Sequence, residues 1–366
     1  MRQFDYAKLK ERLWDTETVN YLSQIHELKG KQKLYLKQKP EQLDRLVEIA
    51  KIQSTQSSNE IEGIRTTETR LRQLMEEKTA PRSRDEKEIA GYRDALNVVH
   101  ESFEYIPLTP NYILQLHKIM FSYTDSAFGG SFKNVQNYIS ATDSEGKRYN
   151  LFTPPAPYET PAAMQEICDA YNIAVGEGKV DPLILIPVFI HDFLCVHPFL
   201  DGNGRIGRLL ITLFLMERKI LTTPALYISY YLKMNRVEYY DRMSEVRKNG
   251  DYEQWVRFFL DALSESAKDA IADVDKLSSL HDANVVKLSG LGARQAKSVM
   301  ALFTYLESNP IIDIGKTAAA LGLSYNTTAK AVSILEEKDI LQQTDKTGRS
   351  RTYCYTAYLD ILRKST

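Results

Sequence analysis

Apolar residues recur at helical spacing along most of the chain, and convincing strand-like alternation is rare. The segment from Gln42 to Ile61 is typical, with Gly63 placed to end the helix. Thr109 can cap a further helix that has Pro110 at its first position. The other helices expected from the pattern span residues 84–105, 109–123, 162–177, 182–195, 206–219, 229–249 and 252–280. The chain is therefore predicted to be mainly α-helical.

The pattern changes between Gly129 and Pro157. Two short extended segments, residues 137–140 and 149–153, flank a turn over residues 143–146. The proline-rich stretch over residues 154–157 cannot lie inside a helix. A β-hairpin is therefore expected within residues 131–153.

The tail has a pattern of its own after a glycine-rich break at residues 290–293. Helices are expected over residues 293–308 and 316–321, and Ser324 can cap a third one. Residues 340–344 and 349–355 then read as two strands around a turn at 345–348. Three helices followed by two strands predict a winged-helix domain over residues 293–366, after a helical region (1–104) and a core (105–285).

Composition narrows the class of protein. A chain of 366 residues suits two or three domains, and a net charge of −1 provides no global field for nucleic acid or anionic membranes. Three separated cysteines suggest neither a disulfide framework nor a metal clip. The N-terminus lacks an apolar signal core, and the most apolar stretch, residues 182–196, is too short and polar to cross a bilayer. We expect a cytoplasmic protein without membrane contact.

One segment of twelve residues, His197 to Arg208, carries the densest chemistry. Gly202 and Gly204 allow backbone N–H groups to approach an anion, next to the N-terminus of a helix that starts near Arg205. Arg205 and Arg208 suit two phosphates of a polyphosphate. Asp201 can hold Mg²⁺ together with phosphate oxygens, and His197 can take a proton near neutral pH. The segment thus combines a base, a metal anchor and a phosphate cradle.

Three other motifs are suggested by short matches, but the surrounding sequence argues against each of them. Gly202, Gly204 and Gly207 match GxGxxG, but their surroundings look helical rather than alternating in strand and helix. Gly315-Lys-Thr resembles the end of a P-loop, yet Pro310 stands where the first glycine is required. His191 and His197 do not have the spacing of a zinc protease.

The segment His197 to Arg208 matches HPFx[D/E]GNGRxxR in full, and here the chain resembles the Fic family over about residues 43–263. The resemblance implies AMP transfer from ATP to a protein hydroxyl, with His197 as base and Asp201 as the Mg²⁺ ligand. It also implies a nucleotide site, with Tyr240 a candidate for adenine stacking. The implied nucleotide-binding residues are Gly202, Asn203, Gly204, Arg205, Ile206, Gly207, Arg208 and Tyr240.

The hairpin within residues 131–153 corresponds to the family's flap, which would hold a target protein by adding a strand. Lys133 stands where many relatives have arginine, so no specific contact is carried over there. Upstream, Ser58 to Gly63 matches the inhibitory pattern [S/T]xxxE[G/N]. Glu62 would pair with Arg208 and block the γ-phosphate, because a carboxylate competes with phosphate for an arginine. The resemblance therefore implies a resting state that is inhibited.

Other readings stay open. Relatives of this kind can remove AMP or transfer other phosphate groups, although the intact Gly204 favours AMP transfer over kinase activity. A DNA-binding regulator is the alternative of another class. Residues 324–330 would start the recognition helix and Lys346, Arg349 and Arg351 would line the wing, but Glu336, Glu337, Asp339 and Asp345 offset that charge. Self-modification and a homodimer are also compatible with the sequence.

Overall fold

The computed structural model describes residues 6–38, 40–75, 79–142, 146–220, 228–347 and 350–363. Helices dominate them, and two small antiparallel sheets complete the fold, so the predicted mainly α-helical class is confirmed. The chain divides into two compact units. Unit 1 consists of Met1–Lys33 and Ala50–Ala267, and unit 2 of Leu34–Ile49 and Lys268–Thr366. The three domain ranges expected from the sequence stay a prediction.

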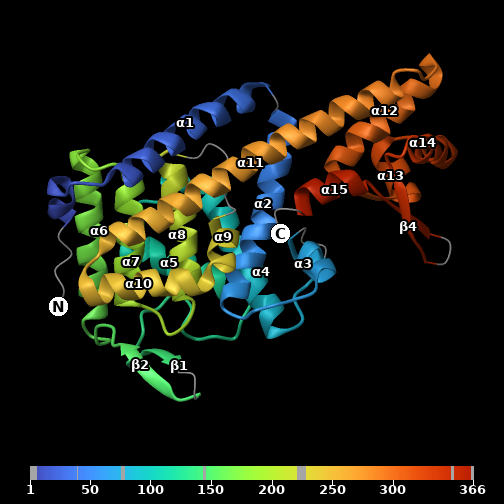
Figure 1. The fold of residues 1–366 in the computed structure, drawn as a ribbon. Coiled ribbons are helices and arrows are strands. Elements are labelled where there is room, and N and C mark those ends of the chain that lie inside the picture. Colours follow the sequence, from blue (N-terminus) through green and yellow to red (C-terminus); the bar gives the residue numbers. More distant parts are fainter. Residues whose placement is uncertain are drawn as a thin grey trace. The chain divides into compact units, whose positions relative to one another are not determined.

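The first eleven helices begin in unit 1 or pass through it (Figure 1). Their bounds are α1 Thr16–Gln38, α2 Pro40–Ile61, α3 Glu68–Met75, α4 Arg84–Ser102, α5 Pro110–Met120, α6 Thr160–Glu177, α7 Pro182–Val196, α8 Asn203–Glu217, α9 Ile228–Met234, α10 Arg236–Asn249 and α11 Tyr252–Leu288. Short 3-10 helices span Tyr6–Glu11 and Phe103–Tyr105. In the described residues no helix is both long and apolar enough to cross a membrane.

The two central helices, α7 and α8, are buried almost throughout. Every residue of α7 from Leu183 to Val196 is buried, which explains why its sequence is apolar all round. Asp181 caps α7 by accepting from the Leu183 N–H at 2.9 Å, and Thr109 caps α5 as predicted. Because α7 and α8 pack against each other, the loop that joins them is held by a rigid frame.

The predicted hairpin forms as β1 (Ile139–Thr142) paired antiparallel with β2 (Arg148–Phe152). Figure 1 shows it projecting from one end of the helices of unit 1. Part of its predicted turn, residues 143–145, lies outside the described residues. Both strands lack a second neighbour among the described residues, so each leaves an edge for pairing with another strand.

Several predicted bounds are wrong. The single helix expected over residues 229–249 breaks at Asn235, whose side chain donates to the Tyr231 carbonyl at 3.0 Å and competes with the helical hydrogen bonds. Helix α8 begins at Asn203 because Gly202, with φ of 82°, already lets its carbonyl accept from the Ile206 N–H. Helix α5 ends at Met120, and α11 continues to Leu288.

Unit 2 contains the tail, with its own apolar core. Its elements are α12 Ala293–Ser308, β3 Ile311–Asp313, α13 Ile314–Leu321, α14 Tyr325–Glu337, β4 Gln342–Thr347, β5 Ser350–Cys354 and α15 Thr356–Arg363. Ser324 caps α14 as predicted, accepting from the Thr327 N–H at 3.2 Å. The turn expected at 345–348 is wrong in its first three residues, which pair with β5.

Strand β3 was not expected from the sequence because three residues are too few to show alternation, and the sheet has the order β3-β5-β4. The elements follow one another as a winged helix requires, although the winged-helix assignment itself and DNA binding by Lys346 and Arg351 stay predictions. Arg349 lies outside the described residues.

Candidate active site

The loop between α7 and α8 places the motif residues at the junction of two buried helix ends. His197 ends α7 with a left-handed backbone (φ 46°), a conformation that costs a non-glycine residue on the order of 1 kcal/mol. Its N–H donates to the Phe193 carbonyl at 3.0 Å. Phe199 is fully buried and anchors the loop in the core. The loop is therefore packed against the core through Phe199.

A second histidine, His117 of α5, holds this loop from behind. Its Nδ1 accepts from the Gly130 N–H at 2.9 Å, so the neutral ring donates from Nε2 to the Asp201 carbonyl at 3.0 Å. The ring stacks on Phe199 with centroids 3.8 Å apart. Burial lowers the pKa of His117 to about 4, which keeps the ring neutral and this bonding pattern intact. Nothing in the spacing of the sequence singled out His117.

The ring of His197 is fixed by two asparagines. Asn137 Nδ2 lies 2.9 Å and Asn203 Nδ2 3.2 Å from His197 Nδ1. Asn137 also donates to the carbonyls of His197 and Phe199, while its Oδ1 accepts from Lys133 Nζ at 3.0 Å, so its amide orientation is settled by its partners. The Nδ1 atom is thus an acceptor, and the neutral ring carries its proton on Nε2.

Electrostatics keeps His197 neutral. Burial, together with the nearby charges of Lys133 and Arg247, lowers its pKa to about 4. Lys133 is itself buried and lies without a carboxylate partner among the described residues, donating to Asn137 and to the Val196 carbonyl at 3.1 Å. Burial accordingly lowers the pKa of Lys133 to about 8. A histidine of this kind stays unprotonated over the physiological pH range.

Asp201 and Arg205 form the second part of the site. The Asp201 side chain is 45 % exposed, and its Oδ1 accepts from the Gly202 N–H at 2.6 Å. Arg205 is 1 % exposed and lies 3.6 Å from that carboxylate and 2.7 Å from Glu88 Oε2 of α4. Glu88 also accepts from Arg84, whose Nη2 lies 3.7 Å from Asp201 Oδ2. Glu88 and Arg84 are neighbours of the motif that sequence analysis missed.

Arg208 is buried and forms hydrogen bonds with two residues of α2 and the turn that follows it. It is 1 % exposed and donates to the Ser58 hydroxyl and the Ser58 carbonyl, both at 2.8 Å. Its Nη2 also donates to Glu62 Oε1 at 2.6 Å. Burial alone would raise the pKa of Glu62, but Arg208 holds it below its usual value, so Glu62 is charged. Arg208 Nη1 is buried and has no hydrogen-bond partner among the described residues.

The Glu62 carboxylate also covers the start of α8. A side chain built on Gly204 would collide with Glu62 Oε1, so the carboxylate rests directly against that glycine. The N-terminus of α8 carries the positive end of its helix dipole and favours an anion there. Gly63 follows with φ of 82° and ends α2 as expected. The Glu62 carboxylate therefore occupies the anion position at the start of α8.

The remaining predicted nucleotide-binding residues occupy different environments. The Ile206 side chain is fully buried in the core and Gly207 faces Leu194, so neither offers a side chain to a ligand. Asn203 is 3 % exposed and donates to the Phe199 carbonyl at 2.8 Å, which stabilises the loop. Tyr240 of α10 is 38 % exposed, with the Arg236 guanidinium 5.8 Å from its ring centre. Tyr240 can thus offer a ring face, while its neighbour Tyr239 is buried.

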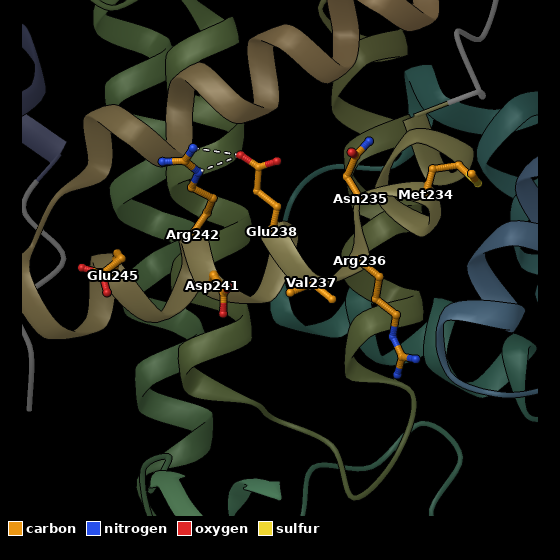
Figure 2. A pocket seen from close by; sticks show the side chains of 8 residues that line it. All are labelled: Met234, Asn235, Arg236, Val237, Glu238, Asp241, Arg242 and Glu245. Carbon is orange, nitrogen blue, oxygen red and sulfur yellow. Dashed lines mark hydrogen bonds and ion pairs between the residues drawn. The ribbon is translucent and has the colours of Figure 1, made fainter. Parts of the chain in front are cut away.

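A hollow of about 550 Å³ lies on the outside of α9 and α10. In Figure 2 Arg242 is joined to Glu238 at one side of this hollow, and Arg236 points away from that pair. No residue from 197 to 208 lines it. We assign it no role in the site.

Among the described residues no group of three or more histidine, cysteine, aspartate or glutamate side chains is placed to hold a metal ion. Asp201 presents a half-exposed carboxylate directly before the start of α8. Mg²⁺ commonly takes one or two protein carboxylates together with substrate phosphates, so this donor set fits Mg²⁺ bound with a nucleotide.

Comparison with known proteins agrees with this geometry. Residues 107–215 match the model of the Fic/DOC family. The protein adenylyltransferase Fic of Drosophila melanogaster is 28 % identical over 249 residues, which cover 67 % of this chain and 45 % of that protein. Its counterpart in Drosophila willistoni is 28 % identical over 210 residues, covering 56 % of this chain and 39 % of the relative. The chain spans less than half the length of these curated relatives.

Solved structures share the fold. A Fic family protein from Desulfovibrio desulfuricans G20 matches with a TM-score of 0.62 and 19 % identity, over 94 % of this chain and 97 % of that one. A Fic domain containing signaling protein from Bacteroides thetaiotaomicron VPI-5482 matches with a TM-score of 0.57 and 24 % identity, over 69 % of this chain and 97 % of that one. With the full motif at the junction of α7 and α8, residues 107–215 thus match the Fic/DOC family, and the chain shares the fold of solved Fic proteins.

Proposed function

We propose that this chain is a protein adenylyltransferase, which moves AMP from ATP to a hydroxyl group of a target protein or of itself, and that Glu62 inhibits it at rest. The observation that carries the proposal is the set at the start of α8. There Arg208, Gly204 and the helix N-terminus converge on one anion position, and the position is filled by Glu62. The curated relatives, which are protein adenylyltransferases, support the same activity.

The reaction follows from these positions. The hydroxyl oxygen of the target attacks the α-phosphorus of ATP, the bond to pyrophosphate breaks, and the hydroxyl proton passes to His197. Backbone N–H groups at Gly202 to Gly204 and the side chains of Arg205 and Arg208 would bind the phosphates and stabilise their charge. Mg²⁺ held by Asp201 would neutralise part of that charge when it is bound.

Two features keep the arrangement at rest. Glu62 occupies the Arg208 guanidinium, so the outer phosphate cannot take its place without displacing a charge-assisted hydrogen bond. In addition, His197 carries its proton on Nε2 because Asn137 and Asn203 approach Nδ1. That proton must move to Nδ1 before Nε2 can accept one from a target. We infer that target binding next to Asn137 helps to release this tautomer.

Removal of AMP from a modified protein is the second candidate activity. It is favoured by the Glu62 carboxylate, which is 31 % exposed beside the α8 N-terminus and could orient a water molecule. Docking of the target on the hairpin, a homodimer, DNA binding by the tail and a cytoplasmic location stay predictions.

The test uses wild type, Glu62→Gly and His197→Ala with Mg²⁺ and ATP labelled at the α- or the γ-phosphate. We expect α-label on protein with Glu62→Gly, little with wild type and none with His197→Ala. Label from the γ-phosphate alone would indicate a kinase. Loss of label from a previously modified protein, faster with wild type than with Glu62→Gly, would indicate AMP removal instead.

A further inference from the structure

A cavity of about 560 Å³ lies beside His197 on the side of the hairpin. Its walls come from the end of β2 with the proline-rich loop behind it, the start of α6, the last residues of α7 and the last turn of α10. Cys195 and Val196, which line it, directly precede His197 in the chain. None of the residues from 197 to 208 lines it, so it is separate from the phosphate cradle. Its volume is in the range of ligand sites.

Hydrogen bonds connect the wall of the cavity to His197. Gln136, one of its lining residues, donates from Nε2 to the Pro154 carbonyl and to the Asn137 carbonyl, both at 3.0 Å. Asn137 in turn contacts His197 Nδ1. A ligand that moves the wall at Gln136 therefore acts on the residue that holds the catalytic ring.

The polar group that faces this cavity without a partner is Arg247 of α10. It is half-buried, and its guanidinium lies 5.5 Å from the centre of the Phe152 ring, which also lines the cavity. Arg247 forms no ion pair among the described residues, and its Nε is buried without a hydrogen-bond partner. A guanidinium in such a place is costly unless an anion accepts from it.

The cavity contains one carboxylate of its own, Glu159, but this group serves the backbone. Its Oε2 accepts from the Ala156 N–H at 3.0 Å at the turn before α6. The contrast with the hollow on α10 is informative, because there Arg242 is neutralised by Glu238 at 2.8 Å (Figure 2). Of these two arginines, five residues apart on one helix, Arg242 has an anionic partner and Arg247 has none within the part of the chain that the structure describes.

We propose that this cavity binds an acidic side chain of the target protein, carried on the same segment as the hydroxyl that His197 serves, with Arg247 as its binding residue. The inference rests on the proposed function and adds the class of target to it. A segment paired with the edge of the hairpin has a fixed register, so the carboxylate lies at a constant offset from the modified residue. Neutralising Arg247 also removes one of the charges that lower the pKa of His197, so the right target makes the base stronger.

The test is a peptide library in which a central Tyr, Ser or Thr is flanked by randomised positions, labelled by the Glu62→Gly protein with α-labelled ATP and Mg²⁺. Self-modified sites in the same protein are mapped by mass spectrometry. We expect Asp or Glu to be enriched at one offset, by roughly 10-fold or more in kcat/KM over the neutral amide, as a hydrogen bond to a charged group implies. In the same background Arg247→Glu should invert the preference toward Lys or Arg.

Two further variants serve as controls for the role of Arg247. Arg247→Met keeps the apolar stem over Phe152 and should abolish the acidic preference without inverting it, and its melting temperature reports whether the fold survives. Lys248→Glu changes the charge of the exposed neighbouring residue on the same helix and should leave the preference unchanged. The KM for ATP should not move in either variant.

The outcomes separate the two proposals. Labelling without an acidic preference, or with one that Arg247→Met leaves intact, overturns the subsite and leaves AMP transfer standing. A rise in the KM for ATP with Arg247→Met, equal for acidic and neutral peptides, assigns Arg247 to the nucleotide and also overturns the subsite. No α-label on peptide or protein from any variant overturns the proposed function and the subsite together.

Discussion

The two sides of His197 differ in how their positive charges are balanced. On the phosphate side Arg208 pairs with Glu62 at 2.6 Å and Arg205 with Glu88 at 2.7 Å. On the hairpin side Lys133 and Arg247 pair with no carboxylate among the described residues. Carboxylates of the chain itself thus balance the arginines on the proposed phosphate side, and the proposed acceptor side stays positive. The first arrangement suits a resting enzyme, and the second suits a partner that brings negative charge.

His197 lies between the two sides, so its removal should have the largest effect. In the Glu62→Gly background His197→Ala should lower the rate of α-label transfer by about 10²- to 10⁴-fold, the usual contribution of general base catalysis. The measurement is initial rate at saturating ATP. His191→Gln is not a fair control because His191 is buried in an ion pair with Asp192. His100→Gln, on the buried side of α4, offers a histidine control outside the site, with a loss below about threefold expected.

The local part of the site could be predicted from the sequence. The motif residues lie within twelve positions, so the distances between them depend mainly on the turn between two helices. A loop between the helices and a glycine at the start of the second one could therefore be predicted. The inhibitory pair was implied by a matching pattern, and the structure places Glu62 on Arg208.

The partners supplied by other elements could not be predicted. Glu88, His117 and Asn137 reach the motif only because α4, α5 and the hairpin pack around α8, and spacing along the chain carries no signal of that packing. Helix α2 is a related case. Its buried face near Arg208 includes Ser58, and small polar residues are also buried around it, namely Ser54, Thr55, Ser57 and Asn59. Hydrophobic periodicity identified the helix but could not identify that face.

The balance on the phosphate side is broken directly by Glu62→Gly. Loss of a charge-assisted hydrogen bond that competes with phosphate should raise the rate of self-modification by roughly 10- to 100-fold, which corresponds to about 1.5–3 kcal/mol. The matched control is Glu60→Gly in the same helix, which removes a carboxylate that pairs with Lys233 rather than with Arg208. Equal activation by both variants would mean that loosening α2, and not freeing Arg208, is what matters.

The role of the charges on the acceptor side can be tested by replacing Asn137 with a charged residue. In the Glu62→Gly background Asn137→Asp places a carboxylate next to His197 Nδ1. The carboxylate can accept a hydrogen bond from an N–H at Nδ1, and its charge should raise the pKa of the ring from about 4. A raised pKa means that the base is lost at higher pH, so the acidic limb of the rate profile should move up by about one to two pH units. At pH 8, where the ring stays neutral, the rate should rise by a few fold.

The control for this shift is Asn134→Asp, because Asn134 is exposed on the same segment and has no contact with the ring. The other charges facing His197 are those of Lys133, Arg247, Glu62 and Asp201, and only Glu62 is changed in the background. An acidic limb that stays in place with Asn137→Asp would show that a group other than His197 sets it.

The smallest effect is expected at Arg84, which is 78 % exposed and lies 3.7 Å from Asp201 Oδ2. An exposed pair of this kind is worth about 1 kcal/mol at most, so Arg84→Gln should lower the Mg²⁺ concentration for half-maximal rate by no more than about fivefold. Lys87→Gln, on the same helix and paired with Asp125, should have no effect. If Arg84→Gln instead raised the Mg²⁺ and ATP requirement, Arg84 would belong to the nucleotide site. The phosphate side would then contain a third arginine. Unlike Arg205 and Arg208, this arginine is mostly exposed.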